Sequence, residues 1–183
     1  MLTHPENYPY QEIKERIIAI DDTKRRACVA FLYATGCRAS EVIKLESNNI
    51  RLTTDLFDRK IIRISTITLK NKTDRDRLIP VHIDSEKWLA KLIWRYKKSH
   101  EGKLFDVDRA TIWRWSMEAF GINPHGFRKI RGTHLVTKFK FSDQALTKFM
   151  GWTDSRPARY YIKLRIEDIV PEIKNVREVK SNV

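Results

Sequence analysis

The sequence predicts a mostly α-helical fold with a small antiparallel β-sheet, an α+β class. Apolar residues recur at helical spacing through most of the chain, and one central segment is rich in Ile, Thr, Leu and Val on both sides of a polar turn. No repeat or Gly/Ser-rich linker interrupts the 183 residues. Because 42% of them are hydrophobic, the chain can bury one core, and we expect residues 1–183 to form a single domain.

Three helices are predicted in the N-terminal part of the chain. The first spans Pro9 to Ile20. The second follows an Asp21-Asp22 cap, is strongly apolar and ends near Gly36, because aspartate favours helix starts and glycine favours helix ends. The segment CRASEVIKL opens the third helix.

A β-hairpin is predicted at residues 59–83, RKIIRISTITLKNKTDRDRLIPVHI, where two β-prone runs flank the charged turn NKTDRD. Helical spacing returns at Ser85, with Trp88, Leu89 and Leu92 on one face. Further helices are predicted over Arg109–Phe120, His125–Phe139, Ser142–Met150 and Arg156–Leu164, with a tail helix after Pro171.

The charge balance indicates a polyanionic partner. The chain has 36 Lys and Arg against 23 Asp and Glu, a formal net charge of +13. Basic surfaces of this kind bind nucleic acid by releasing its counterions, although a merely soluble basic surface is the alternative. No long apolar run, signal-peptide pattern or lipid-anchor motif is present, so we expect a cytoplasmic location on DNA and no membrane partner.

Neither a metal site nor a bound cofactor is expected. Cys28 and Cys37 lie nine positions apart in a segment predicted to be helical, and we expect both to be reduced, packed side chains. The sequence has no clustered carboxylates suited to Mg²⁺, no HExxH, no P-loop and no GxGxxG. A protein of this composition that acts on DNA would have to stabilise phosphate charge with side-chain cations.

Two pairs of residues could provide such cations. In TGCRASEV, Arg38 begins a helix three residues before Glu41, so the carboxylate can hold the guanidinium. In NPHGFRKIRGTHL, His125 and Arg128 share one face of a helix start, where backbone N–H groups favour an anion. Taken alone, each pair is also compatible with a structural role, a surface ion pair or a capping histidine.

Lys72, Trp152 and two adjacent tyrosines complete the candidates. Lys72 lies in the hairpin turn, where it could donate a proton or be one polar lysine among several. Trp152 follows a helix end, and its indole N–H can donate to a phosphate oxygen or belong to the core. Tyr160 and Tyr161 come next. A phenol with a pKa of about 10 is a weak nucleophile and needs cations around the phosphate that it attacks.

The order of these motifs resembles the catalytic domain of the tyrosine recombinases, the family of phage integrases, Xer recombinases and Cre-like enzymes. TGCRASEV resembles the family's first-arginine box, LKNKTDRDRLIPV its lysine-bearing hairpin and HGFRKIRGTHL its His-x-x-Arg box. MGWTDSRPARYY resembles the box that contains the nucleophilic tyrosine. The four motifs occur in family order between Glu12 and Lys163, and they imply the tyrosine recombinase catalytic-domain fold.

The resemblance implies that the catalytic residues are Arg38, Lys72, His125, Arg128, Trp152 and Tyr161, with Glu41 supporting Arg38. The lysine is placed five residues before Arg77 of the hairpin, and Lys70 is the fallback. Tyr161 is preferred over Tyr160 because nine residues separate the nucleophile from the position of Trp152 in the family pattern. The residues predicted to contact DNA are Lys70, Arg75, Lys129, Arg131, Arg156 and Arg159.

Two departures from the family pattern indicate a divergent branch, such as an integrase of a virus or plasmid. Lys129 stands where a second histidine is common, and Pro157 interrupts the segment that contains the tyrosines. Family members usually have an N-terminal helical domain that closes around DNA. We therefore interpret residues 1–10 as a linker remnant, and the chain as a catalytic-domain fragment or a natural minimal enzyme without that domain.

The implied activity is cleavage and rejoining of DNA through a 3′-phosphotyrosyl intermediate, without metal, ATP or another cofactor. The implied partner is double-stranded DNA, on which strand exchange requires a homotetramer, with a monomer expected when free. The tail helix at residues 166–183 is expected to dock on a neighbouring subunit or to pack on its own domain. The alternatives are a non-catalytic DNA-binding protein with this fold and a type IB topoisomerase-like enzyme that relaxes DNA.

Overall fold

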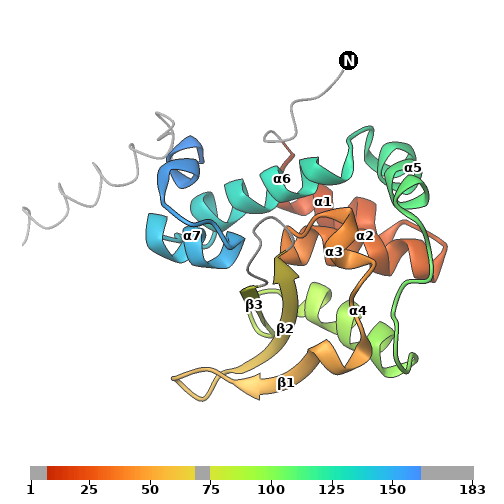
Figure 1. Cartoon of the computed structure of the whole chain (residues 1–183), viewed down its shortest axis with the longest axis horizontal. Coiled ribbons are helices and arrows are strands. Elements are labelled where there is room, and N and C mark those ends of the chain that lie inside the picture. The colour runs from red at the N-terminus through yellow and green to blue at the C-terminus, as the bar shows by residue number, and fades with distance from the viewer. Residues whose placement is uncertain (1–7, 69–74, 162–183) are drawn as a thin grey trace, which may run out of the picture.

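The computed structural model describes residues 8–68 and 75–161, and it confirms the predicted α+β class (Figure 1). Within these residues the chain forms helices α1 to α7, two short 3₁₀ helices and one antiparallel sheet of three strands. The elements are, in chain order, α1 (Tyr10–Ile18), α2 (Thr23–Thr35), α3 (Ala39–Val42), η2 (Ser47–Asn49), β1 (Ile50–Thr54), β2 (Lys60–Thr68), β3 (Arg75–His82), α4 (Lys87–Lys98), α5 (Arg109–Phe120), α6 (Pro124–Thr137), α7 (Asp143–Met150) and η3 (Arg156–Tyr160).

The predicted hairpin forms β2 and β3, and a third strand precedes it. The hairpin register pairs Thr66 with Arg77 and Thr68 with Arg75, directly before the turn. Strand β1 pairs with the outer side of β2 in the order β1-β2-β3. It was not predicted because it is only five residues long and only Ile50 within it is buried, so it has little apolar pattern.

Helix α2 forms the centre of the helical part. Every residue from Ala27 to Thr35 is buried, as expected for a helix that is apolar on all sides. It packs against α4 and α6 and also contacts α1, α3 and α5. In Figure 1 helices α1, α2, α3, α5 and α6 occupy the upper part of the view, while the sheet lies below them with α4 beside it. None of the described helices is long and apolar enough to cross a membrane.

Helix ends follow the capping residues in the sequence. The Asp22 carboxylate accepts a hydrogen bond from the Arg25 amide at 2.6 Å, and α2 ends at Gly36, whose φ of 57° is left-handed. The helix therefore stops two residues before Cys37. The prediction that Cys28 and Cys37 lie in one helix is wrong in this respect, although both are buried, free thiols.

The segment that contains the tyrosines differs from its prediction. An α-helix was predicted over Arg156–Leu164, but in the described part of this segment, residues 156–161, the chain forms the short 3₁₀ helix η3, with Pro157 in its first turn. Proline favours a helix start and lacks the N–H that a preceding turn would need, so the segment begins a new helix at this point. The predicted tail helix lies outside the described residues, as do Lys70 and Lys72.

Candidate active site

The ends of α2 and α7 meet at the candidate site. Both helices end in a left-handed glycine, Gly36 with φ 57° and Gly151 with φ 66°. A methyl group placed on Gly36 would lie 3.2 Å from the sulfur of Met150, so the two helix ends are in close contact. This contact brings together the turn before Arg38 and the chain that leads from α7 to Trp152.

Arg128 lies between these two helix ends. Its side chain extends from α6 and is buried, with Nη1 donating to the carbonyl oxygen of Gly36 at 2.7 Å and Nη2 to that of Met150 at 2.6 Å. Burial, together with the nearby Arg77 cation, lowers the pKa of Arg128 to about 10. The guanidinium thus stays charged at neutral pH, and two backbone carbonyls fix its orientation.

Arg38 and Glu41 form the contact that their spacing predicted. Arg38 precedes α3, and its Nη1 donates to Oε1 of Glu41 at 3.0 Å, while its backbone N–H donates to Oε2 at 2.9 Å. Glu41 is buried, whereas the Arg38 side chain keeps 35% of its surface exposed. The carboxylate therefore holds the guanidinium from the inside and leaves its outer N–H groups accessible to an anion.

His125 lies on the first turn of α6, at the surface beside this cluster. Partial burial of its ring lowers its pKa, and the cations of Arg128, Lys129 and Arg38 lower it further. The influence of all three on one imidazole indicates that the two predicted motifs converge in space. At neutral pH the ring is neutral, so it can accept a proton as well as donate one.

Trp152 and Tyr161 extend the cluster. The guanidinium carbon of Arg128 lies 5.6 Å from the centre of the Trp152 ring, and that ring stacks on Tyr161 with 5.6 Å between centroids and 25° between planes. The Tyr161 ring also lies directly against Gly132 of α6, because a methyl group there would be 2.6 Å from Cε1 of the tyrosine. Tyr160, in contrast, is 78% exposed.

The structure adds two residues that the sequence interpretation did not assign to the site. Gly132 leaves room for the Tyr161 ring, and buried Arg77 donates to the same Met150 carbonyl as Arg128. Arg77 had served only to locate Lys72. The alternation of β3 contains the missing signal, since residue 77 lies on the same face as buried Ile79 and Val81 and must therefore point inward.

The prediction that Arg131 contacts DNA is corrected. Arg131 is 1% exposed and forms a bidentate ion pair with Glu86, with N–O distances of 2.6 Å and 2.7 Å. Its charge is paired inside the protein and does not reach the surface. Lys129 and Arg159 are exposed as a DNA contact requires, and Arg75 opens β3.

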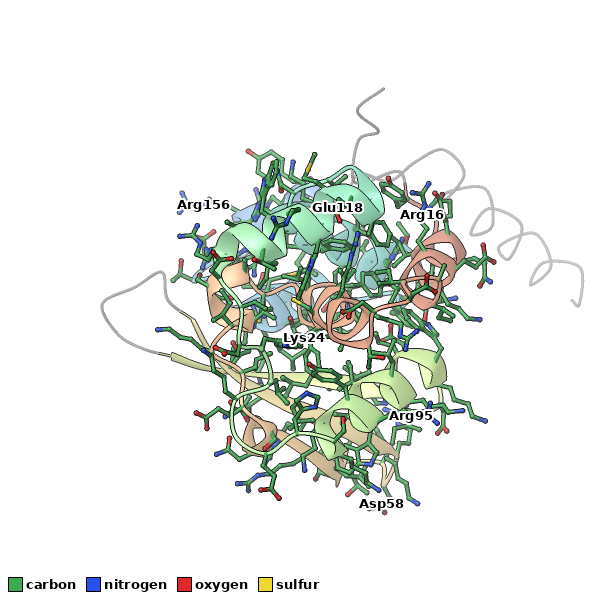
Figure 2. All side chains as sticks on the ribbon, turned by 90° about the vertical axis from the view of Figure 1, so that its right-hand side faces the viewer. Arg16, Lys24, Asp58, Arg95, Glu118 and Arg156 are labelled. Atoms are coloured by element: carbon green, nitrogen blue, oxygen red, sulfur yellow. The ribbon has the colours of Figure 1, made fainter. Side chains whose placement is uncertain are left out.

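Arg156 is exposed too, and it pairs with Asp154 at 2.9 Å. In Figure 2 it lies at the edge of the molecule, far from Asp58 of the β1–β2 turn. Such an exposed pair is weak and can give way to a phosphate.

The fold and the convergence of these residues define the catalytic domain of a tyrosine recombinase. The chain belongs to the phage integrase family, which it matches over residues 10–167. No significant match is found among curated protein sequences.

Solved structures share this fold at low sequence identity. The XerH recombinase bound to its difH substrate matches with a TM-score of 0.66 and 17% identity, over 91% of this chain and 52% of XerH. The XerA recombinase matches with a TM-score of 0.65 and 20% identity, over 93% of this chain and 65% of XerA. The Tn1549 transposon integrase in complex with transposon right end DNA matches with a TM-score of 0.58 and 16% identity, over 93% and 65% of the two chains. The chain thus spans about half the length of XerH.

Proposed function

We propose that the chain cleaves and rejoins DNA as a site-specific recombinase or integrase, with Tyr161 as the nucleophile and without metal or ATP. The observation that supports this most directly is the continuous contact from Arg128 through Trp152 to Tyr161. It links the Tyr161 ring, through Trp152, to the buried cation of Arg128, and attack on a phosphodiester needs cations around the phosphate. Tyr160 faces solvent and has no such surroundings.

The proposed reaction is a transesterification. The phenolic oxygen of Tyr161 attacks the scissile phosphorus and forms a 3′-phosphotyrosyl bond, while the bond to the 5′ oxygen breaks. Lys72 protonates that oxygen, and neutral His125 is the candidate acceptor of the phenolic proton. Arg38, Arg128 and the indole N–H of Trp152 stabilise charge on the non-bridging oxygens. The 5′-hydroxyl of a partner strand then reverses the step.

Double-stranded DNA is the proposed substrate, with a tetramer as the working unit for strand exchange and a cytoplasmic location on DNA. The net charge of +13 favours a polyanion, and XerH and the Tn1549 integrase were solved with bound DNA. A mobile element of a virus or plasmid is the proposed origin, because Lys129 and Pro157 depart from the family pattern.

The test is the capture of a covalent protein–DNA adduct. Nicked duplexes with randomised sequence around the nick serve as suicide substrates, since the short fragment diffuses away after cleavage and traps the protein on the DNA. Wild type should form adducts that survive denaturing electrophoresis, whereas Tyr161→Phe should form none because it lacks the nucleophilic oxygen. Tyr160→Phe is the matched control and should keep the adduct.

The other outcomes separate the alternative functions. DNA binding without any adduct would favour a non-catalytic DNA-binding protein. Adducts distributed evenly over the randomised sequences, together with relaxation of supercoiled plasmid, would favour a topoisomerase-like enzyme. Adducts that persist in Tyr161→Phe and vanish in Tyr160→Phe would identify Tyr160 as the nucleophile.

A further inference from the structure

We propose that Arg77 is a positioning residue that prepares the site for a phosphate by holding Arg128 in place. The inference rests on the proposed function, because it concerns the anion that Arg128 binds. Arg77 lies on β3 and is 4% exposed. Its guanidinium donates to the carbonyl oxygen of Thr35 at 2.7 Å, to that of Met150 at 3.0 Å and to the sulfur of Cys37 at 3.0 Å.

These three acceptors belong to the segments that surround Arg128. Thr35 is the last residue of α2, Met150 is the last residue of α7, and Cys37 directly precedes Arg38. The Cys37 sulfur also contacts the hydroxyl of Thr66, which pairs with Arg77 across the hairpin. One side chain therefore fixes two helix ends relative to the base of the hairpin turn.

Arg128 depends on the same helix ends for its orientation. Its Nη2 shares the Met150 carbonyl with Arg77, and its Nη1 is bound by the carbonyl of Gly36, the residue after Thr35. Both acceptors of Arg128 are thus either held by Arg77 or adjacent to a carbonyl that Arg77 holds. Without Arg77 we expect both carbonyl acceptors to shift. The N–H groups of Arg128 that remain for a phosphate would then no longer point in a fixed direction.

The charge of Arg77 also supports a role in preparing the site for an anion. In the described part of the chain, no carboxylate forms an ion pair with Arg77. Its Nε is buried without a hydrogen-bond partner, as is Nε of Arg131, so the missing carboxylate is what distinguishes the two arginines. The C-terminal ends of α2 and α7 provide only partial negative charge. A buried cation that is incompletely compensated favours the arrival of an anion nearby, and the neighbouring Arg128 is the group that would bind it.

Arg131 provides the contrast. It is as deeply buried as Arg77, but Glu86 compensates its charge through two hydrogen bonds. Substitution of Arg131 should therefore lower stability, as the loss of any buried arginine does, but should leave anion binding unchanged. Arg77→Lys and Arg131→Lys form a matched pair, since each keeps the charge and removes the fork of donors. Arg77→Met removes the charge as well.

Sulfate is the probe for the anion site. The melting temperature is measured with increasing sodium sulfate against sodium chloride of equal ionic strength, and Arg128→Met gives the baseline for non-specific effects. Wild type should be stabilised above this baseline. The excess should vanish in Arg77→Met and shrink in Arg77→Lys. Arg131→Lys should melt lower without sulfate and keep the wild-type excess. A wild-type excess in both Arg77 variants, or no excess in wild type, would overturn the inference.

Adduct formation separates this inference from the proposed function. Arg77→Lys should lower the single-turnover rate of adduct formation by about tenfold to a hundredfold, because misplacement of a catalytic group by about 1 Å has effects of this size. Arg131→Lys should stay within about threefold of wild type once the fraction folded is corrected. A sulfate effect that depends on Arg77 in a protein that forms no adduct would contradict the proposed function alone. Wild-type adduct rates in Arg77→Lys would contradict the inference alone.

Discussion

At the residue scale, the proposed site depends on a glycine that leaves space for a ring as well as on reactive side chains. Arg38, Arg128 and Trp152 could be predicted because their motifs occur in a fixed order along the chain. Gly132 and Arg77 could not be assigned in this way, because their roles come from contacts with Tyr161 and Met150, which are distant in sequence. A glycine within a helix loses stability relative to alanine, so its presence at position 132 has a packing reason.

Gly132→Ala should displace Tyr161, the proposed nucleophile, without unfolding the protein. The new methyl group would lie 2.6 Å from Cε1 and 2.8 Å from Cδ1 of Tyr161, so the ring must leave α6, while the helix itself gains propensity. We expect adduct formation to slow by about tenfold or more, because the phenol loses its orientation.

Nitration by tetranitromethane, quantified by peptide mass spectrometry, reports the position of Tyr161 directly. Tyr161 should react faster in Gly132→Ala than in wild type. Tyr160 is the internal control, since it is already 78% exposed and should react equally in both proteins. Equal nitration of Tyr161 in the two proteins would mean that the ring does not occupy this position in solution.

At the scale of elements, the sequence was sufficient wherever periodicity and capping agreed. Helices α2, α5 and α7 end at glycines with left-handed backbone, and their predicted and observed bounds agree closely. The pattern failed for β1, whose residues are mostly exposed. It also failed for η3, where an α-helix was predicted and Pro157 instead starts a short 3₁₀ helix. The conformation of β1 is decided by its pairing with β2, whereas that of η3 follows from the local effect of Pro157.

Substitution of Asn123 tests whether a DNA phosphate binds at the start of α6. The Asn123 side chain caps the helix by accepting from the Gly126 amide at 3.1 Å, two residues before His125. Asn123→Ala should lower the free energy of unfolding by about 1 kcal/mol. Asn123→Asp should retain the cap and the stability, but should weaken DNA binding, because it adds a carboxylate beside the cations that would face the phosphate.

Urea unfolding and titration of labelled DNA, carried out on the same three proteins, separate these effects. Asn123→Asp is the informative variant, since aspartate has nearly the size and shape of asparagine and differs from it in charge. DNA affinity that is unchanged in Asn123→Asp would mean that DNA does not approach this helix end.

At the scale of the whole molecule, a buried polar network joins elements that are distant in sequence. His134 of α6 accepts from the hydroxyl of Tyr33 of α2 at Nδ1, 2.9 Å away, and donates from Nε2 to the carbonyl of Tyr8 at 2.8 Å. This tautomer follows from the Tyr8 carbonyl, which can only accept. Next to it, Arg131 pairs with Glu86 and lies 5.2 Å from the centre of the Tyr33 ring.

The network predicts a loss of stability in mild acid. Burial lowers the pKa of His134 from 6.5 to about 4; the Tyr8 carbonyl and Glu86 oppose this shift, while Arg131 and Lys138 reinforce it. Between these two pKa values the unfolded chain binds a proton that the folded protein does not, so stability is complete above about pH 6.5 and falls as the pH drops towards 4. From pH 7 to pH 5 the expected loss is about 2 kcal/mol.

His134→Gln removes this titration while its amide can still donate to the Tyr8 carbonyl, so it is the matched variant for urea unfolding at pH 7 and pH 5. It should be less stable than wild type at pH 7, because its fit in the network is poorer, and its stability should change less with pH. The difference between the two pH slopes isolates His134 from the carboxylates and other histidines, which both proteins share. Parallel slopes would mean that His134 takes up its proton as readily in the folded protein as in the unfolded chain, and that the network is open to water.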